Sequence, residues 1–167
     1  MKNSKHILVF IAVSLLLAAC GVYNFTGGNT GKAKNFQVNY FQNNAPIIEP
    51  GLDRDFTQFL QNLIVTQTNL DLTTSDADLV YEGEIVEYRI IPNSATANQT
   101  AAQNRLTIAV NVRYTNNVEE EKDFERRFSF FYDYPASTAI ESVKAEAHEA
   151  IFERIGQDIF NASLADW

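Results

Sequence analysis

Histidine and cysteine are nearly absent from this chain of 167 residues, which contains two histidines and one cysteine. His6 and His148 are far apart, and so few imidazoles exclude most histidine-based metal sites and leave little for histidine-dependent catalysis. With Cys20 alone, no disulfide can form within the chain. The sequence also lacks a Gly-x-Ser-x-Gly motif, a phosphate-binding loop and a dinucleotide-binding fingerprint. We therefore expect a non-enzymatic protein that carries no cofactor.

Positive charge is scarce as well. Thirteen Lys and Arg residues stand against 21 Asp and Glu residues, which gives a formal net charge of −8. This balance argues against nucleic acid as a partner and against electrostatic docking to anionic lipid.

The first twenty residues have the three zones of a secretion signal. Lys2 and Lys5 precede an apolar run over residues 7–17, and Leu17-Ala18-Ala19-Cys20 then matches the lipobox of bacterial lipoproteins at all four positions. A run of about 11 residues is too short to span a bilayer, which needs about 20. We therefore predict a signal peptide over 1–19 and lipid attachment at Cys20. In the sorting rule of such lipoproteins, Gly21 rather than Asp after the cysteine favours the outer membrane.

Glycine is concentrated behind this cysteine, since Gly27, Gly28 and Gly31 fall within five positions. We expect residues 20–34 to form a flexible tether, followed by a single domain over 35–167. Period-two patterns predict strands at about 36–40, 79–91, 105–114 and 123–134, and spacings of three and four predict helices at 51–68 and from about 139 almost to the C-terminus. This β-α-β-β-β-α order predicts an α+β fold, a two-layer α/β sandwich with both helices on one face of a four-stranded mixed sheet.

Three finer features follow from the same patterns. The apolar face of the second strand changes parity between Ile85 and Tyr88, which predicts a β-bulge near Val86–Glu87. Thr138 followed by Glu141 is a capping-box signature for the last helix. Leu63 and Ile151 are expected in the core, packed on the sheet face that carries Ile108 and Val110.

Several acidic residues are candidates for catalysis or metal binding. Glu82, Glu84 and Glu87 on the second strand are either paired carboxylates or the solvated outer face of the sheet, and we favour the outer face. Asp71, Asp76 and Asp78 lack the spacing of a calcium-binding loop, so no metal site is predicted. His148 is expected to be an exposed helix residue.

Two surface features are candidates for binding. Phe131 should point away from the helices, as a partner interface or as part of a covered edge strand. Arg105 and Arg113 share the open face of the third strand, and one of Arg126 and Arg127 should join them. Guanidinium groups suit phosphate, so these four arginines are the candidate ligands for a phosphate group. The alternative is an ordinary exposed ion pair, with Glu82 opposite Arg113.

Several segments together resemble the lipopolysaccharide-assembly lipoprotein family, LptE, in a divergent form. They span nearly the whole chain after the signal: Cys20-Gly21-Val22-Tyr23-Asn24-Phe25, Tyr81-Glu82-Gly83-Glu84-Ile85, Asn104-Arg105-Leu106-Thr107-Ile108, Val112-Arg113-Tyr114, Lys122-Asp123-Phe124-Glu125 and Asp158-Ile159-Phe160-Asn161. One departure is Thr26 before Gly27, where better-known members tend to carry a basic residue.

The resemblance implies a non-enzymatic lipoprotein on the periplasmic side of the outer membrane. Members of the family plug a large β-barrel, LptD, help it to assemble, and take part with it in lipopolysaccharide transport to the cell surface. Some bind lipopolysaccharide directly, and its head group carries phosphates, so the resemblance makes lipopolysaccharide the candidate ligand of the four arginines named above. The alternative is a periplasmic lipoprotein that binds a lipid or another small ligand.

Lipid attachment gives the first prediction. Replacing Cys20 by Ala removes the thiol that accepts the diacylglyceryl group, so the precursor should be neither acylated nor cleaved before residue 20. Mass spectrometry of the membrane-extracted protein measures both modifications. Normal processing of the variant would contradict the prediction.

Overall fold

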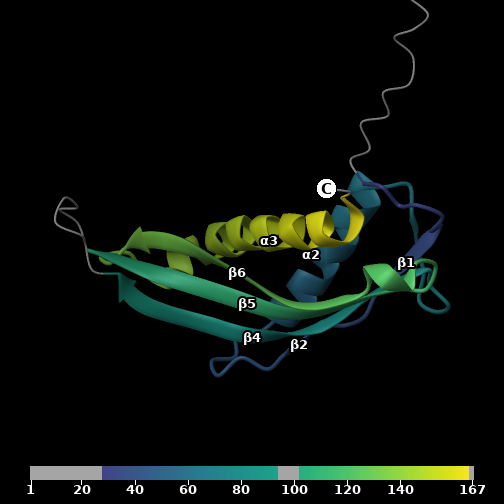
Figure 1. Ribbon diagram of the computed structural model, residues 1–167. Coiled ribbons are helices and arrows are strands. Elements are labelled where there is room, and N and C mark those ends of the chain that lie inside the picture. Colours follow the sequence, from purple (N-terminus) through teal and green to yellow (C-terminus); the bar gives the residue numbers. More distant parts are fainter. Residues whose placement is uncertain (1–27, 94–101, 166–167) are drawn as a thin grey trace, which may run out of the picture.

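The computed structural model describes residues 28–93 and 102–165. The domain has two layers: helices α2 and α3 lie on one face of a sheet whose other face is open (Figure 1). The elements, in chain order, are β1 (Asn35–Val38), β2 (Gln42–Asn43), α2 (Leu52–Gln67), β3 (Asp71–Leu72), β4 (Leu79–Asn93), β5 (Gln103–Asn116), a 3-10 turn η1 (Glu120–Lys122), β6 (Phe124–Pro135) and α3 (Ile140–Leu164). The α+β sandwich predicted from the sequence is confirmed.

The sheet is mixed and has six strands instead of the four expected. Its order is β3-β1-β4-β5-β6, and β2 also pairs with β4. β1 and β2 both run parallel to β4, whereas β4, β5 and β6 form an antiparallel meander. The additional strands, β2 and β3, are two residues each. Segments this short have no period-two pattern, so the sequence alone did not predict them.

The predicted bulge is present in β4. The pairing with β5 shifts register between Ile85 and Glu87, so that Ile85 pairs with Val110 and Tyr88 with Ile108. Both Ile85 and Tyr88 are buried. The extra residue, Val86, therefore keeps the apolar side chains of both halves of β4 on the helix-covered face.

The start of α3 differs from the capping prediction. The N-cap of α3 is Ala139, with no side-chain hydrogen bond, so the capping box at Thr138 is wrong. The Thr138 N–H donates to the carbonyl oxygen of Pro135, which holds Thr138 in the preceding turn. Glu141 forms an ion pair with Lys144 at 2.8 Å instead of reaching back to a backbone N–H.

The core lies between the helices and the inner sheet face. Tyr81 is fully buried at its centre, and its hydroxyl donates to the Ser163 hydroxyl of α3 at 2.9 Å. Burial raises the pKa of Tyr81 far above its ordinary value, so the phenol stays neutral. The aliphatic residues of this core are fully or almost fully buried: Leu52, Leu60, Ile64, Leu79, Ile85, Leu106, Ile108, Val110, Val112, Ile151, Ile155 and Ile159.

Leu63 corrects part of the core prediction. Ile151 is fully buried, but Leu63 is only partly buried and packs at the edge of the cluster. It lies against α3 near Gly156, where an added Cβ would approach the Leu63 side chain to 2.9 Å. Leu63 therefore supports the contact between the helices, while its neighbours Leu60 and Ile64 are fully buried.

We predict unequal costs for truncating the two residues. Ile151→Ala should lower the free energy of unfolding by about 2–5 kcal/mol because it leaves a cavity in the core. Leu63→Ala should cost about half as much, because its site is partly open to solvent and less apolar area is lost. Urea denaturation of both variants measures the difference, and equal costs would contradict this description of the core.

Candidate functional site

The open face of the sheet carries most of the candidate residues from the sequence. Successive side chains of a strand point to opposite faces, and the register of β4, β5 and β6 aligns the outward ones in rows across the sheet. The charged residues that face outward, together with Asn111, are Glu82, Glu84, Glu87, Arg89, Arg105, Asn111, Arg113, Glu125, Arg127 and Asp133. The expectation that the three glutamates of β4 lie on the outer face is confirmed.

Arg113 lies in the middle of a row of side chains formed by Asn39, Glu82, Arg113 and Glu125. Its guanidinium donates to Glu82 of β4 at 3.1 Å and to Glu125 of β6 at 3.3 Å. Glu82 also accepts from the side-chain amide of Asn39 at 3.3 Å. The hydrogen bonds to Glu125 and then to Glu82 raise the pKa of Arg113. This is the cross-strand arrangement that the sequence offered as the alternative to a phosphate site, and such exposed ion pairs contribute about 0–1 kcal/mol.

Glu84 lies in the middle of a second row, formed by Asn44, Glu84 and Asn111. Its carboxylate accepts from the Asn44 side-chain amide at 2.6 Å and from that of Asn111 at 3.5 Å. Asn44 comes directly after β2, which runs parallel to β4 with Gln42 beside Glu84. The short β2 strand thus places a third amide-bearing residue, Gln42, next to this carboxylate.

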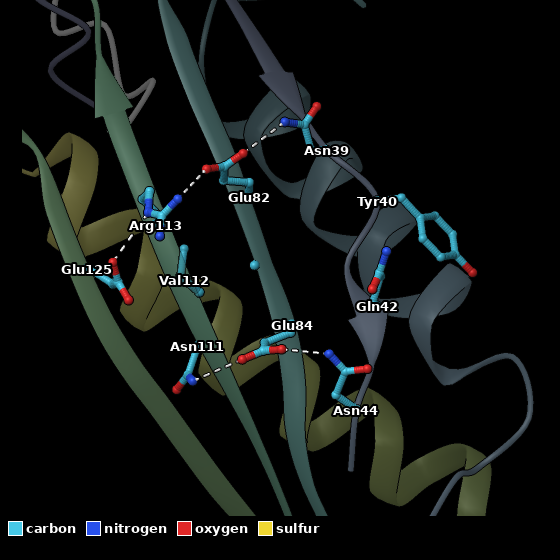
Figure 2. A pocket seen from close by; sticks show the side chains of 11 residues that line it. Asn39, Tyr40, Gln42, Asn44, Glu82, Glu84, Asn111, Val112, Arg113 and Glu125 are labelled. Atoms are coloured by element: carbon cyan, nitrogen blue, oxygen red, sulfur yellow. Dashed lines mark hydrogen bonds and ion pairs between the residues drawn. The ribbon is translucent and has the colours of Figure 1, made fainter.

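A groove of about 380 Å³ lies between these two rows. Figure 2 shows one row from Asn39 through Glu82 and Arg113 to Glu125, and a second from Asn44 through Glu84 to Asn111. Tyr40, whose side chain is 56% exposed, lies at the β1–β2 side of the groove.

The backbone of Gly83 and Val112 lies between the rows. A Cβ at Gly83 would be 2.0 Å from the carbonyl oxygen of Asn111 and 2.8 Å from the Phe41 ring. Only glycine therefore fits at this point of the sheet, and the local spacing of β4 and β5 depends on it.

The four candidate phosphate ligands divide between the faces of the sheet. Arg127 shares the open face with Arg105 and Arg113, as the sequence suggested for one of the pair, and it forms an ion pair with Glu87. Arg126 lies on the opposite face, with its guanidinium 5.7 Å from the Phe124 ring centre and 6.0 Å from that of Phe128. The structure therefore brings three of the four arginines onto one face, each beside a carboxylate.

Arg105 and Phe131 form a separate feature of the open face. Arg105 donates two hydrogen bonds of 2.7 Å to Asp133, and its guanidinium lies 3.6 Å from the Phe131 ring centre. The paired guanidinium holds the pKa of Asp133 below its ordinary value. Phe131 points away from the helices, as predicted, and is 41% exposed. Arginine stacked on an aromatic ring gives a rigid surface of the kind enriched at protein interfaces.

His148 departs from its prediction. It is half-buried on α3, with its ring 5.8 Å from that of Phe152 and its Nε2 3.3 Å from the Tyr88 hydroxyl. Burial lowers its pKa, and burial also raises the pKa of Tyr88 to about 12. The sequence gave no sign of this contact because its partner lies on β4, 60 positions away.

Within residues 28–93 and 102–165 no three His, Cys, Asp or Glu side chains gather as metal ligands, and Asp78 accepts the backbone N–H of Lys34 at 2.7 Å. Cys20 and the predicted signal peptide lie outside the described residues. Of the helices described, none has the length and apolarity to cross a bilayer.

The structure is a small α+β domain with an open polar sheet face. A family model described as LptE, lipopolysaccharide-assembly, matches residues 33–163, which is the whole two-layer domain. The chain belongs to the LptE family, and the resemblance seen in the sequence is confirmed.

Of three similar solved structures, the first shows the same fold at low sequence identity, and the other two are more distant. The hypothetical protein CT253 from Chlamydia trachomatis is 11% identical, with a TM-score of 0.56 over 80% of this chain and 100% of that one. A minor lipoprotein from Acinetobacter baumannii is 11% identical, with a TM-score of 0.44 over 77% and 91% of the two chains. Rare lipoprotein B from Shewanella oneidensis is 11% identical, with a TM-score of 0.42 over 75% and 89%. No curated protein matches the chain.

The arginine hypothesis stays a prediction, and its test rests on Arg105 because Arg113 lies between Glu82 and Glu125, whose charges repel an anion. If Arg105 holds phosphate, the replacement Arg105→Gln should weaken binding to lipopolysaccharide micelles about tenfold, because its charge-assisted contact is lost. Arg154→Gln on α3 is the matched control. Equal binding by both variants in a fluorescence titration would contradict the hypothesis.

Proposed function

We propose that this protein is an outer-membrane lipoprotein, anchored on the periplasmic side through Cys20, that plugs a large LptD-like β-barrel and assists its assembly. In this role it takes part in lipopolysaccharide transport to the cell surface without catalysing a reaction or carrying a cofactor. The single observation that carries the proposal is the family match over residues 33–163.

The open sheet face has the chemistry that the lumen of a large barrel requires. Large outer-membrane barrels enclose a polar, water-filled interior. The outward side chains of β4, β5 and β6 are mainly charged residues and amides. Most of the charges already have partners, as in the rows around Arg113 and Glu87. Exposed ion pairs of this kind are weak, so exchanging some of them for contacts with a lumen wall would cost little.

The Arg105–Phe131 surface is the proposed anchor for the barrel. Ile91, 38% exposed, pairs with Arg105 across β4 and β5, and Phe131 stacks on the same guanidinium. An aromatic ring, an arginine and an aliphatic side chain held together before binding need little further ordering when a partner arrives. The Ile91–Arg105 pair lies two positions from Asn93–Gln103, the last described pair at the hairpin end of β4 and β5.

The alternative function, a periplasmic lipoprotein that binds a lipid or another small ligand, draws support from the groove between the Glu82 and Glu84 rows. That groove is lined mainly by polar groups, which suits a hydrophilic ligand better than an acyl chain. The two functions differ in whether a barrel protein co-purifies with the lipoprotein from detergent-solubilised membranes.

We predict that the full-length lipoprotein, extracted from outer membranes with mild detergent, brings down a large barrel protein at one-to-one stoichiometry. The complex should persist in moderate salt, because most outward charges of the open face are already paired. Quantitative mass spectrometry of the eluate measures the ratio. Recovery of the lipoprotein without any barrel would contradict the proposed function.

Phe131→Ala should weaken this complex about tenfold or more, which is the cost typical of losing an aromatic anchor at an interface. Leu72→Ala is the matched control, since Leu72 is 46% exposed and lies on β3 at the other edge of the sheet. Competition pull-downs with equal amounts of wild-type protein measure the ratio, and equal retention of the two variants would contradict the role given to Phe131.

A further inference from the structure

Glu84 is a carboxylate without a counter-ion in the part of the chain that the structure describes. Arg113, the one cation that lines the groove, pairs with Glu82 and Glu125. The neighbouring Arg127 and Arg89 both pair with Glu87. Glu84 is bound only by neutral amides. The groove lining carries three carboxylates and one guanidinium, so a positive group is favoured there and an anion is repelled.

The two amides fix Glu84 without neutralising it. Asn44 holds one carboxylate oxygen from the β2 side, and Asn111 reaches the other from β5. Two ionised carboxylate oxygens offer about four acceptor sites, so each oxygen retains room for another donor. Because the carboxylate is already oriented, a ligand that binds it does not have to order it.

We propose that the open-face groove binds a protonated amine carried on a hydroxylated ring, that is an amino sugar, with Glu84 as the counter-ion of its ammonium group. The ammonium would donate charge-assisted hydrogen bonds to the free acceptor sites of Glu84. This site goes beyond the barrel-plug function and does not depend on it.

The rest of the lining selects for hydroxyl groups. Gln42, exposed beside Glu84, offers an amide that donates and accepts, as does Asn39 at the other row. Hydroxyl groups also donate and accept, so they match such a lining better than purely accepting or purely donating ligands do. The exposed ring of Tyr40 adds an apolar surface at the margin, suited to the C–H face of a sugar ring. The volume of about 380 Å³ lies within the range of small-molecule sites.

Phosphate does not fit this groove. Arg113 is the only donor there that carries charge, and both of its neighbours in the row are carboxylates within 3.3 Å. A phosphate would approach Glu82, Glu125 and Glu84 together with the one arginine, at a net repulsion. The groove and the Arg105 surface are therefore expected to differ in the sign of the ligand charge that they prefer.

The experiment is a titration of the mature, ¹⁵N-labelled lipoprotein in a non-ionic polyoxyethylene detergent, followed by the side-chain amide signals of Asn44 and Asn111. Glucosamine should shift these signals with a Kd of about 1–10 mM, as expected for one charge-assisted contact in an open groove. Glucose should bind about tenfold more weakly, because it lacks the ammonium group. Inorganic phosphate should not shift the signals at the same concentrations.

Glu84→Gln tests the counter-ion directly, because Gln keeps an oxygen that accepts from Asn44 and removes the charge. It should weaken glucosamine binding about tenfold and leave the affinity for glucose nearly unchanged. Glu121→Gln, an exposed change in η1 outside the groove, is the matched control and should bind as the wild type does. Thermal melting of both variants confirms that each is folded.

Equal affinities for glucosamine and glucose would overturn the proposal, and so would unchanged glucosamine binding by folded Glu84→Gln. Binding of ethanolamine as tight as that of glucosamine would also overturn it, because it would exclude a role for the sugar ring. Because the titration contains no barrel protein, its failure leaves the proposed barrel association unaffected, and failure of that association leaves the titration result unaffected.

Discussion

The antiparallel ladder between β4 and β5 is the constraint on which the rest of this structure depends. It runs from the pair Leu79–Asn116 to the pair Asn93–Gln103, and it carries the helix-covered core on one side and the ion-paired rows on the other. Because side chains alternate with period two, a slip of one residue would exchange the two faces over the whole length of the ladder. The bulge at Val86 makes the sequence compatible with one register only: without it, Tyr88 would face solvent and Glu87 would face the core.

The same ladder explains which parts of the fold could be predicted from sequence. The alternation in β5 and the parity change in β4 are local patterns, so the central strands, the bulge and the orientation of Phe131 were all predicted correctly. The start of α3 was not, because Thr138 and Glu141 fit a capping box locally but are held by Pro135 and Lys144 in the folded chain. Leu63 had the right spacing for the core, yet it faces α3 because α2 packs against a second helix as well as the sheet.

The candidate site was harder to predict for the same reason. Arg113 opposite Glu82 followed from the hairpin, but the groove beside them needs β2, a two-residue strand that pairs in parallel with β4 over a long connection. Asn44, about 40 positions before Glu84, belongs to a polar stretch without periodicity. Sequence patterns report which face a residue occupies, whereas non-local hydrogen bonds between polar side chains determine which charges remain unpaired.

The chain enters and leaves the domain at the same end. The Asn29 N–H donates to the carbonyl oxygen of Leu164 at 2.7 Å, and Gly28 lies against Phe160 and Leu164 near the C-terminal end of α3. The β4–β5 hairpin extends toward the opposite end (Figure 1), and the 15 residues of β4 span about 50 Å at ~3.3 Å each. In the proposed lipoprotein, a membrane attachment through Cys20 would therefore act at the end of the domain opposite the β4–β5 hairpin. Phe131 pairs with Thr107 and lies farther along the ladder from that end than Arg113 does, so a tilt of the domain about such an attachment would move Phe131 through a larger arc than the groove.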